Sequence, residues 1–245
     1  MSTPPNGPAK NQILANLSDK DYQRLRPHLE LVDLNHGDVL YDMGDAIEFL
    51  YFPYNAMVSL VTQMEDGKIV EVGVVGTDGM TGISALMGNA SSFDRALVQI
   101  PDSGVRVRVA VIQAEFDRGE KLQHLLLRYM NNFMRQVSQT AACNASHTTE
   151  ERLARWLLMC HDRVDSMKLN LTQEFLSEML GTRRATVNVA AITLQSADLI
   201  QYNRGQITIT DRNGLEDFSC ECYGILKSAT PSVDGDGSNT NTRHR

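Results

Sequence analysis

A short stretch in the C-terminal half of the chain gathers side chains that can donate hydrogen bonds. Arg183, Arg184, Thr186 and Asn188 follow closely after Gly181. An Arg can donate two hydrogen bonds to the edge of guanine, and an Asn can pair in the same way with adenine. Side chains of these types at the start of one helix are suited to reading bases. We therefore expect them to be the recognition residues of a nucleic-acid-binding surface.

The segment 171–191 predicts the helices that present these side chains. Thr172 can cap a first short helix, and Gln173 lies beside this cap, so both join the expected DNA-contacting set. Gly181 suits a tight turn, and Thr182 is the expected cap of a second helix. In a helix-turn-helix, the second helix enters the major groove of double-stranded DNA. The residues expected to face inward from this helix are Val187, either Val189 or Ala190, and Leu194.

A basic turn follows the two helices. The segments 201–202 and 207–209 have strand character and flank Asn203-Arg204-Gly205. This pattern predicts a hairpin wing with Arg204 at its tip, where an Arg is placed to touch phosphate. A helix-turn-helix followed by a basic-tipped hairpin is more specific than either pattern alone, so double-stranded DNA is the expected partner.

The apolar stripe that precedes this unit predicts a long helix. No Gly or Pro occurs from Glu120 to Arg163, and apolar residues recur at spacings of three and four. Two copies of such a helix can pair in a homodimer with an inverted-repeat operator. The alternative is that the stripe packs on the chain's own β domain. The expected seam residues are Leu122, Leu126, Tyr129, Phe133, Val137, Thr140 and Asn144.

Short β segments broken by Gly, Asp and Pro fill residues 31–111. Glu65-Asp66-Gly67-Lys68 between two β-rich runs is a strong hairpin signal. Many short antiparallel strands at this spacing favour a jelly roll, so the fold class is α+β with an N-terminal double-stranded β-helix. We expect a disordered N-terminus (1–11), a β-roll sensory domain (12–113), a dimerisation helix (114–147), a winged helix-turn-helix (148–227) and a disordered tail (228–245).

Charge and composition limit the surroundings of the chain. The net charge is −7, but residues 1–113 carry most of the acidity, with 14 acidic and 8 basic side chains. The DNA-reading segment is locally basic. The chain shows no transmembrane run and no secretory signal, so we expect a cytoplasmic protein without a membrane partner. Cys220-x-Cys222 is too short for the usual zinc knuckle and no His follows it at ligand spacing, which predicts no metal site.

Taken together, these motifs resemble the Crp/Fnr family over residues 12–225. Gly37-Asp38-Val39-Leu40-Tyr41 with Met43-Gly44-Asp45 resembles the family's early β-roll motif, and Leu171 to Val187 resembles its helix-turn-helix. The resemblance implies a cyclic-nucleotide-binding-like domain, a dimer helix and a winged helix-turn-helix. Arg184 falls where the family places its base-reading Arg. Ala185 replaces the usual Glu and Val189 replaces a second Arg, so base readout is expected to differ.

The sensory cassette departs further from the family. Members that bind cyclic AMP hold the ribose with a Glu and the phosphate with an Arg. Here the first element reads Gly79-Met80-Thr81-Gly82, and the second reads Asp94-Arg95-Ala96, with its Arg one place late. Met cannot replace the carboxylate, because it is only a weak acceptor. We expect no cyclic AMP in the usual pose. Arg95 either serves another anion or is a solvated strand end.

Other sensors of the family are poorly matched. No cysteine precedes Cys143, which argues against an iron–sulfur cluster. His28 and His36 lack a distinctive haem context and are expected to be turn or surface residues. Cys143 is either an oxidant-sensing thiol or a packed one. No cofactor is evident, which leaves an unknown small-molecule effector open.

Two rival classes remain at this stage. The chain has no Gly-rich phosphate loop, nucleophile elbow or metal-binding His pair, which argues against an enzyme. Asp38, Asp42, Asp45 and Glu48 form an acidic cluster that we expect to be solvated. A dimeric interaction module without DNA binding is the other rival class. For a DNA-binding regulator, RNA polymerase is a further candidate partner.

Overall fold

The computed structural model describes residues 10–88, 91–164 and 166–229. Its N-terminal half is a β-roll of two antiparallel sheets, one ordered β1-β7-β3 and the other β2-β6-β4-β5. This confirms the expected double-stranded β-helix. The strands are β1 (Glu30–Leu34), β2 (Val39–Tyr41), β3 (Phe49–Pro53), β4 (Met57–Gln63), β5 (Ile69–Val75), β6 (Arg95–Ile100) and β7 (Asp102–Arg108).

Alternating apolar residues hold the two sheets together. The inward side chains of β3 and β7 meet those of β4 and β6, and the largest of them are fully buried. Arg106 points the other way on β7, as the alternation of Val with Arg predicts. The expected β4–β5 hairpin is present, and Gly67 takes a φ of 83° in its turn. Short helices precede or interrupt the roll: α1 (Gln12–Ala15), α2 (Asp19–Leu25), η1 (Arg26–His28) and η2 (Ile83–Met87).

The long helix packs against its own β-roll. After α3 (Val109–Phe116), helix α4 (Lys121–Ser146) has 26 residues. Leu122 and Leu126 are buried in the core of the β-roll, and Tyr129 and Phe133 pack against that core. The face of α4 that carries these four residues therefore packs on the chain's own β-roll, which was the alternative to a dimer seam. Of the remaining seam candidates, Val137 and Thr140 are half-buried and Asn144 is exposed.

Gln136 joins α4 to the free edge of the second sheet. Its Oε1 accepts from the amide of Val74 over 2.6 Å, and its Nε2 donates to the carbonyl of Val74 over 3.2 Å. The side-chain amide of Gln136 thus pairs with both the N–H and the C=O of Val74, as a neighbouring strand would at the edge of a sheet. The ring of Phe133 lies against Gly73, where a Cβ would approach it to 2.7 Å. Helix α4 and strand β5 are therefore fitted together closely.

The C-terminal half is a three-stranded winged helix-turn-helix. Helix α5 begins with the expected capping box of Thr148 and Glu151. Lys168–Asn170, expected to be connector, instead forms β8 and pairs with β10, so the sheet order is β8-β10-β9. The elements are α5 (Thr149–His161), β8 (Lys168–Asn170), α6 (Gln173–Met179), α7 (Arg184–Ser196), β9 (Ile200–Asn203), β10 (Gln206–Ile209), α8 (Arg212–Phe218) and α9 (Glu221–Ala229).

Two expected boundaries shift at the ends of the described chain. Asn11 is fully buried and caps α1, and its side chain donates to the carbonyls of Pro53 and Gly79, so it is not disordered. Helix α9 continues through Ala229, beyond the expected start of the tail. The rest of the expected disorder, residues 1–9 and 230–245, lies outside the described residues. Within the described ranges, no helix is both long enough and apolar enough to cross a membrane.

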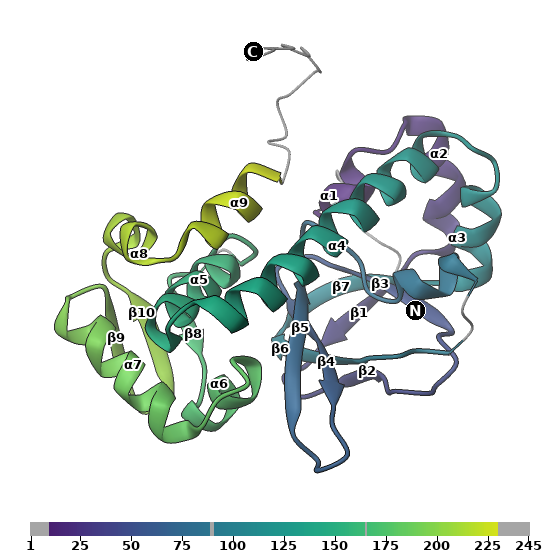
Figure 1. Cartoon of the computed structure of the whole chain (residues 1–245). Helices are drawn as coiled ribbons and strands as arrows, with labels where there is room; N and C mark the ends of the chain where they lie inside the picture. Colours follow the sequence, from purple (N-terminus) through teal and green to yellow (C-terminus); the bar gives the residue numbers. More distant parts are fainter. Residues whose placement is uncertain (1–9, 89–90, 165, 230–245) are drawn as a thin grey trace, which may run out of the picture.

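The β-roll and the C-terminal domain share part of their core. Figure 1 shows α4 running from the β-roll to the C-terminal domain, with α6 close to β5. Met57, Val61 and Val74 of the β-roll belong to the same buried cluster as Leu157 and Met179 of the C-terminal domain. The orientation of the helix-turn-helix is therefore fixed by packing as well as by the chain connection.

Candidate functional site

Local hydrogen bonds position the two helices of the helix-turn-helix. The hydroxyl of Thr172 accepts from the amide of Phe175 over 3.2 Å, which confirms the expected first cap. Gly181 makes the turn with a φ of 59°. The expected second cap is wrong, because Arg183 rather than Thr182 is the N-cap residue of α7, and its side chain makes no capping hydrogen bond. Arg184 is therefore the first residue of the second helix.

The outward face of α7 carries the predicted recognition residues. Arg183, Arg184, Thr186 and Asn188 are all exposed. On the inward face, Ala190 rather than Val189 is buried, together with Val187 and Leu194. Val189 and Ile192 are 55% and 54% exposed, so two apolar side chains stand beside the polar ones. Such side chains can contact the methyl group of thymine.

Gln173 connects the two main base-reading candidates. Its Nε2 donates to Oδ1 of Asn188 over 2.7 Å, and its Oε1 accepts from Nε of Arg184 over 3.4 Å. The bond from Arg184 uses Nε, so both terminal Nη groups keep the fork geometry that pairs with guanine. Gln173 thus orients Arg184 and Asn188 from the first helix.

The wing closes one side of a groove next to these residues. β9 and β10 are joined by the two-residue turn Arg204-Gly205, with φ values of 47° and 80° that match a type I′ turn. The hydroxyl of Tyr202 donates to the carbonyl of Leu171 over 3.0 Å, which fixes the wing to the start of α6. Burial raises the pKa of Tyr202, and the charge of Arg184 opposes this shift.

This groove has a volume of about 450 Å³. Five of the seven residues predicted to bind DNA line it, while Arg183 and Thr186 are exposed on α7 outside its lining. Gln195 and Tyr202 also line it and were not anticipated, because only the fold brings the end of α7 to the wing. The predicted lining residues are Thr172, Gln173, Arg184, Asn188 and Arg204.

Most of the residues expected to form an effector pocket in the β-roll contact other parts of the same chain. Met80 and Thr81 are fully buried. Gly79 packs against Tyr129, whose hydroxyl donates to the carbonyl of Met80 over 2.7 Å. The amide of Gly82 donates to the hydroxyl of Tyr41. These backbone groups already have partners.

Arg95 is also engaged within the chain. Its Nε and Nη2 donate to the two carboxylate oxygens of Asp42 over 2.9 Å and 2.7 Å. This pairing lowers the pKa of Asp42. Arg95 and Asp42 therefore form a partly exposed ion pair, with 26% and 41% of their side chains accessible to solvent.

A buried carboxylate joins the β-roll to the C-terminal domain. Glu71 of β5 accepts from Nε1 of Trp156 over 2.8 Å and from Nε2 of Gln99 over 3.1 Å, and the hydroxyl of Ser59 donates to the same carboxylate. Burial raises the pKa of Glu71 to about 7. No local pattern predicts this contact, because Glu71 and Trp156 are 85 residues apart.

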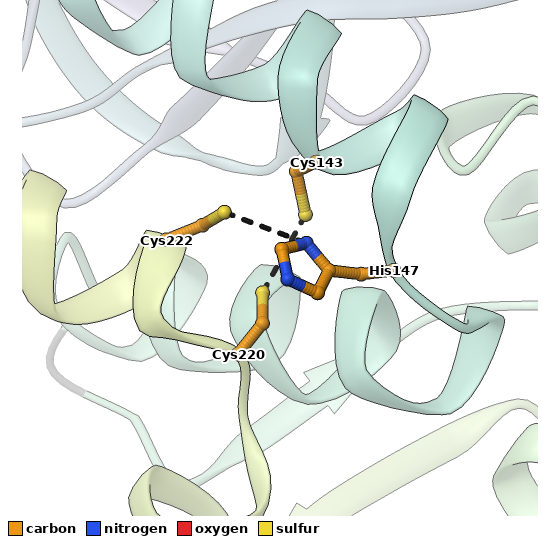
Figure 2. Close-up of side chains that lie close together, drawn as sticks. All are labelled: Cys143, His147, Cys220 and Cys222. Atoms are coloured by element: carbon orange, nitrogen blue, oxygen red, sulfur yellow. Dashed lines mark hydrogen bonds between the residues drawn. The ribbon is translucent and has the colours of Figure 1, made fainter.

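Three thiols and an imidazole converge between α4 and α9, as Figure 2 shows. The potential ligand atoms of Cys143, His147, Cys220 and Cys222 all lie within 4.8 Å of one another. The expectation that the cysteines carry no metal site rested on linear spacing. It missed this group, because two of its members lie on a helix more than 70 residues before the other two.

Comparison with known proteins agrees with this arrangement. Residues 151–218 match the Crp-like helix-turn-helix domain. The chain is 24% identical over 176 residues to the global nitrogen regulator of Nostoc sp. (strain PCC 7120), a match that covers 68% of this chain and 78% of that protein. It is 22% identical over 190 residues to the global nitrogen regulator of Synechococcus elongatus, covering 74% and 86%.

Solved structures share the fold. FixK2 from Bradyrhizobium japonicum superposes with a TM-score of 0.67 at 17% identity, over 78% of this chain and 98% of its own. The c-di-GMP-responsive global regulator CLP from Xanthomonas campestris superposes with a TM-score of 0.66 at 14% identity, over 79% and 100%. The whole architecture of β-roll, long helix and winged helix-turn-helix is therefore common to these chains.

Proposed function

Because this chain is a DNA-binding transcription regulator of the Crp/Fnr type, we propose that it acts as a homodimer on an inverted-repeat operator. Regulators of this type are not enzymes. They bind DNA and usually form dimers. A two-fold dimer presents two recognition helices, which suits half-sites about one helical turn, or about 34 Å, apart.

The observation that carries this proposal is the groove between α7 and the wing. It brings a base-reading pair, Arg184 and Asn188, next to a wing cation, Arg204. We assign Arg184 to guanine and Asn188 to adenine, because each offers the matching bidentate geometry. Arg204 contacts phosphate and contributes affinity without sequence preference. Thr172 and Gln173 contact the backbone beside the half-site, and Arg183 and Thr186 flank the bases.

The dimer seam lies on the outer face of α4. Leu127 and Met134 are large apolar side chains that are 49% and 64% exposed there. They belong to a 3-4 repeat on the face away from the β-roll, and its remaining positions are small or polar, which suits close approach of two helices. The seam that we propose comprises Leu127, Asn131, Met134, Ser138, Ala141 and Ala145.

The β-roll then acts on the DNA-binding domain through α4 and β5. It either transmits an effector signal or holds the domain in one fixed orientation. An effector other than cyclic AMP is proposed, since Arg95 is already paired with Asp42. RNA polymerase is the partner we propose for transcriptional output. Since such a role requires access to the genome, we propose that the chain is cytoplasmic.

Two measurements test the proposal. The first is footprinting of the purified chain on genomic fragments, and the second is sedimentation of the protein alone and bound to DNA. We expect a protected inverted repeat, two chains per site and an affinity that falls steeply with salt. A monomer that protects single half-sites would overturn the dimer. Equal protection of all DNA sequences in the footprint would overturn the specific operator.

A further inference from the structure

The cysteine and histidine cluster lies where the long helix meets the end of the DNA-binding domain (Figure 2). Cys143 and His147 are one turn apart at the C-terminal end of α4. Cys220 and Cys222 lie at the start of α9. Three of the four side chains are buried and His147 is half-buried. Two elements that are remote in sequence thus direct soft ligand atoms to one point.

The distances fit the edges of a tetrahedral site. Sγ of Cys143 lies 3.5 Å from Sγ of Cys220, and Sγ of Cys222 lies 3.6 Å from Nδ1 of His147. Zinc bonds of about 2.3 Å to sulfur and about 2.0 Å to nitrogen give S···S edges of about 3.8 Å and S···N edges of about 3.5 Å. The four atoms therefore need only small shifts to surround one ion.

The imidazole is held in the orientation that ligation requires. Nε2 of His147 lies 3.1 Å from the Glu221 carboxylate, while Nδ1 faces the thiols. A proton on Nε2 that is donated to this carboxylate leaves the lone pair of Nδ1 free for a metal. The carboxylate–histidine–metal arrangement is the usual support of zinc-bound histidines. Gln139 adds a hydrogen bond from Nε2 to Sγ of Cys222 over 3.0 Å.

Nearby buried charge fits a metal–thiolate centre. Arg152 and Arg155 of α5 are buried, and both interact electrostatically with Cys143. Among the described residues, Nε of each guanidinium has no hydrogen-bond partner. A divalent ion with three thiolates and a neutral imidazole carries one net negative charge. Such a centre would compensate buried positive charge at this position.

We propose that Cys143, His147, Cys220 and Cys222 bind a single zinc ion that fixes the end of the dimer helix to the C-terminal helix of the DNA-binding domain. Four protein ligands leave no open position, so the site is structural rather than catalytic. Soft thiolates with one imidazole favour zinc over magnesium or calcium. Because the ion joins α4 to α9, its occupancy stabilises one orientation of the DNA-binding domain.

The first experiment measures metal in the full chain, purified under reducing conditions without chelator. We expect one zinc per chain, and after removal of zinc one Co²⁺ per chain with the visible absorption of a tetrahedral thiolate site. Cys220→Ser and Cys222→Ser should each lose tight metal binding. Cys160→Ser is the matched control, because Cys160 is equally buried but lies outside the cluster, so this variant should keep full occupancy.

A second variant separates ligation from folding. Glu221 is 70% exposed at its side chain, so Glu221→Gln should leave the fold intact, as circular dichroism would show. It should weaken Zn²⁺ binding about 10–100-fold, as loss of the group that hydrogen-bonds to a metal-binding histidine does. Folded wild-type chain that binds no Co²⁺ after full reduction would overturn the site. Unchanged metal affinity in a folded Cys222→Ser variant would do the same.

Discussion

Nε1 of Trp156 lies 2.8 Å from a carboxylate oxygen of Glu71, so one hydrogen bond joins helix α5 of the DNA-binding domain to strand β5 of the β-roll. Glu71 is buried, and its pKa of about 7 is well above the ordinary value of 4.5. Since Trp156 is the only tryptophan of the chain, its fluorescence reports on this contact directly.

The raised pKa makes stability depend on pH. The folded chain holds a proton on Glu71 up to about pH 7, whereas the unfolded chain releases it near pH 4.5. The free energy of unfolding should therefore fall as pH rises between these values, by an amount on the order of 1–3 kcal/mol. Urea unfolding at pH 5.5 and pH 8, followed by Trp156 fluorescence, measures this change. In Glu71→Gln the contribution of this group should vanish; a variant with the wild-type pH dependence would rule out Glu71 as its source.

Arg184 and Arg204 should differ in how they affect binding. Arg184→Ala should lose about 1–3 kcal/mol on the operator and relax preference at one base pair of each half-site. Arg204→Ala should weaken operator and scrambled DNA alike and reduce the salt slope by about one. Fluorescence anisotropy titrations of both variants on both DNAs measure this difference. Equal losses on the two DNAs for Arg184→Ala would show that Arg184 is not a base reader.

The outer face of α4 should control dimerisation. Met134→Asp places a charge at the proposed seam and should give monomers in sedimentation, because burying an unpaired charge is unfavourable. The matched control is Met87→Asp, since Met87 is similarly exposed but lies on η2, away from α4. That variant should remain dimeric. A dimer that persists in Met134→Asp places the interface elsewhere.

The parts of the fold that depend on local interactions could be predicted from the sequence. The cap at Thr172, the capping box at Thr148 and the turn at Gly181 involve residues a few positions apart, and all three are present. Local spacing does not determine which face of α4 is buried. Its spacing is equally compatible with packing on the β-roll and with pairing to a second copy, and only the position of β5 selects between them.

Contacts between distant segments escaped prediction for the same reason. Glu71 and Trp156 become partners only after the β-roll and α5 have packed together. The thiols of Cys143 and Cys220 are in contact although the two residues are 77 positions apart in the sequence, and no motif spacing predicts such a pair. On the DNA-binding surface, the residue types predicted the chemistry, but the link through Gln173 depends on how α6 crosses α7.

Two glycines should respond in opposite directions to alanine. A Cβ at Gly79 would lie 2.5 Å from the ring of Tyr129, so Gly79→Ala should lower the free energy of unfolding by about 1–3 kcal/mol. Gly224 lies within α9 with no atom near the position of a Cβ, so Gly224→Ala should raise it by about 0.4–1 kcal/mol. Urea titration of both variants tests the pair. Unaltered stability of Gly79→Ala would mean that Tyr129 moves aside freely.

Cyclic AMP should not bind the β-roll. The charge of Arg95 is paired with Asp42, and the side chain of Met80 is fully buried. Isothermal titration calorimetry should detect no heat with the wild-type chain at physiological ligand concentrations. A dissociation constant in the micromolar range would contradict this prediction.

The shared core of the two halves makes the DNA-binding domain unsuitable for transplantation. Met57, Val61 and Val74 pack in the cluster that also holds Leu157 and Met179. A chimera that carried residues 148–229 on another β-roll would expose the apolar side chains that these three residues now cover, unless the new roll offered the same surface. Changes that alter operator preference are therefore better made on the outward face of α7 than by exchanging whole domains.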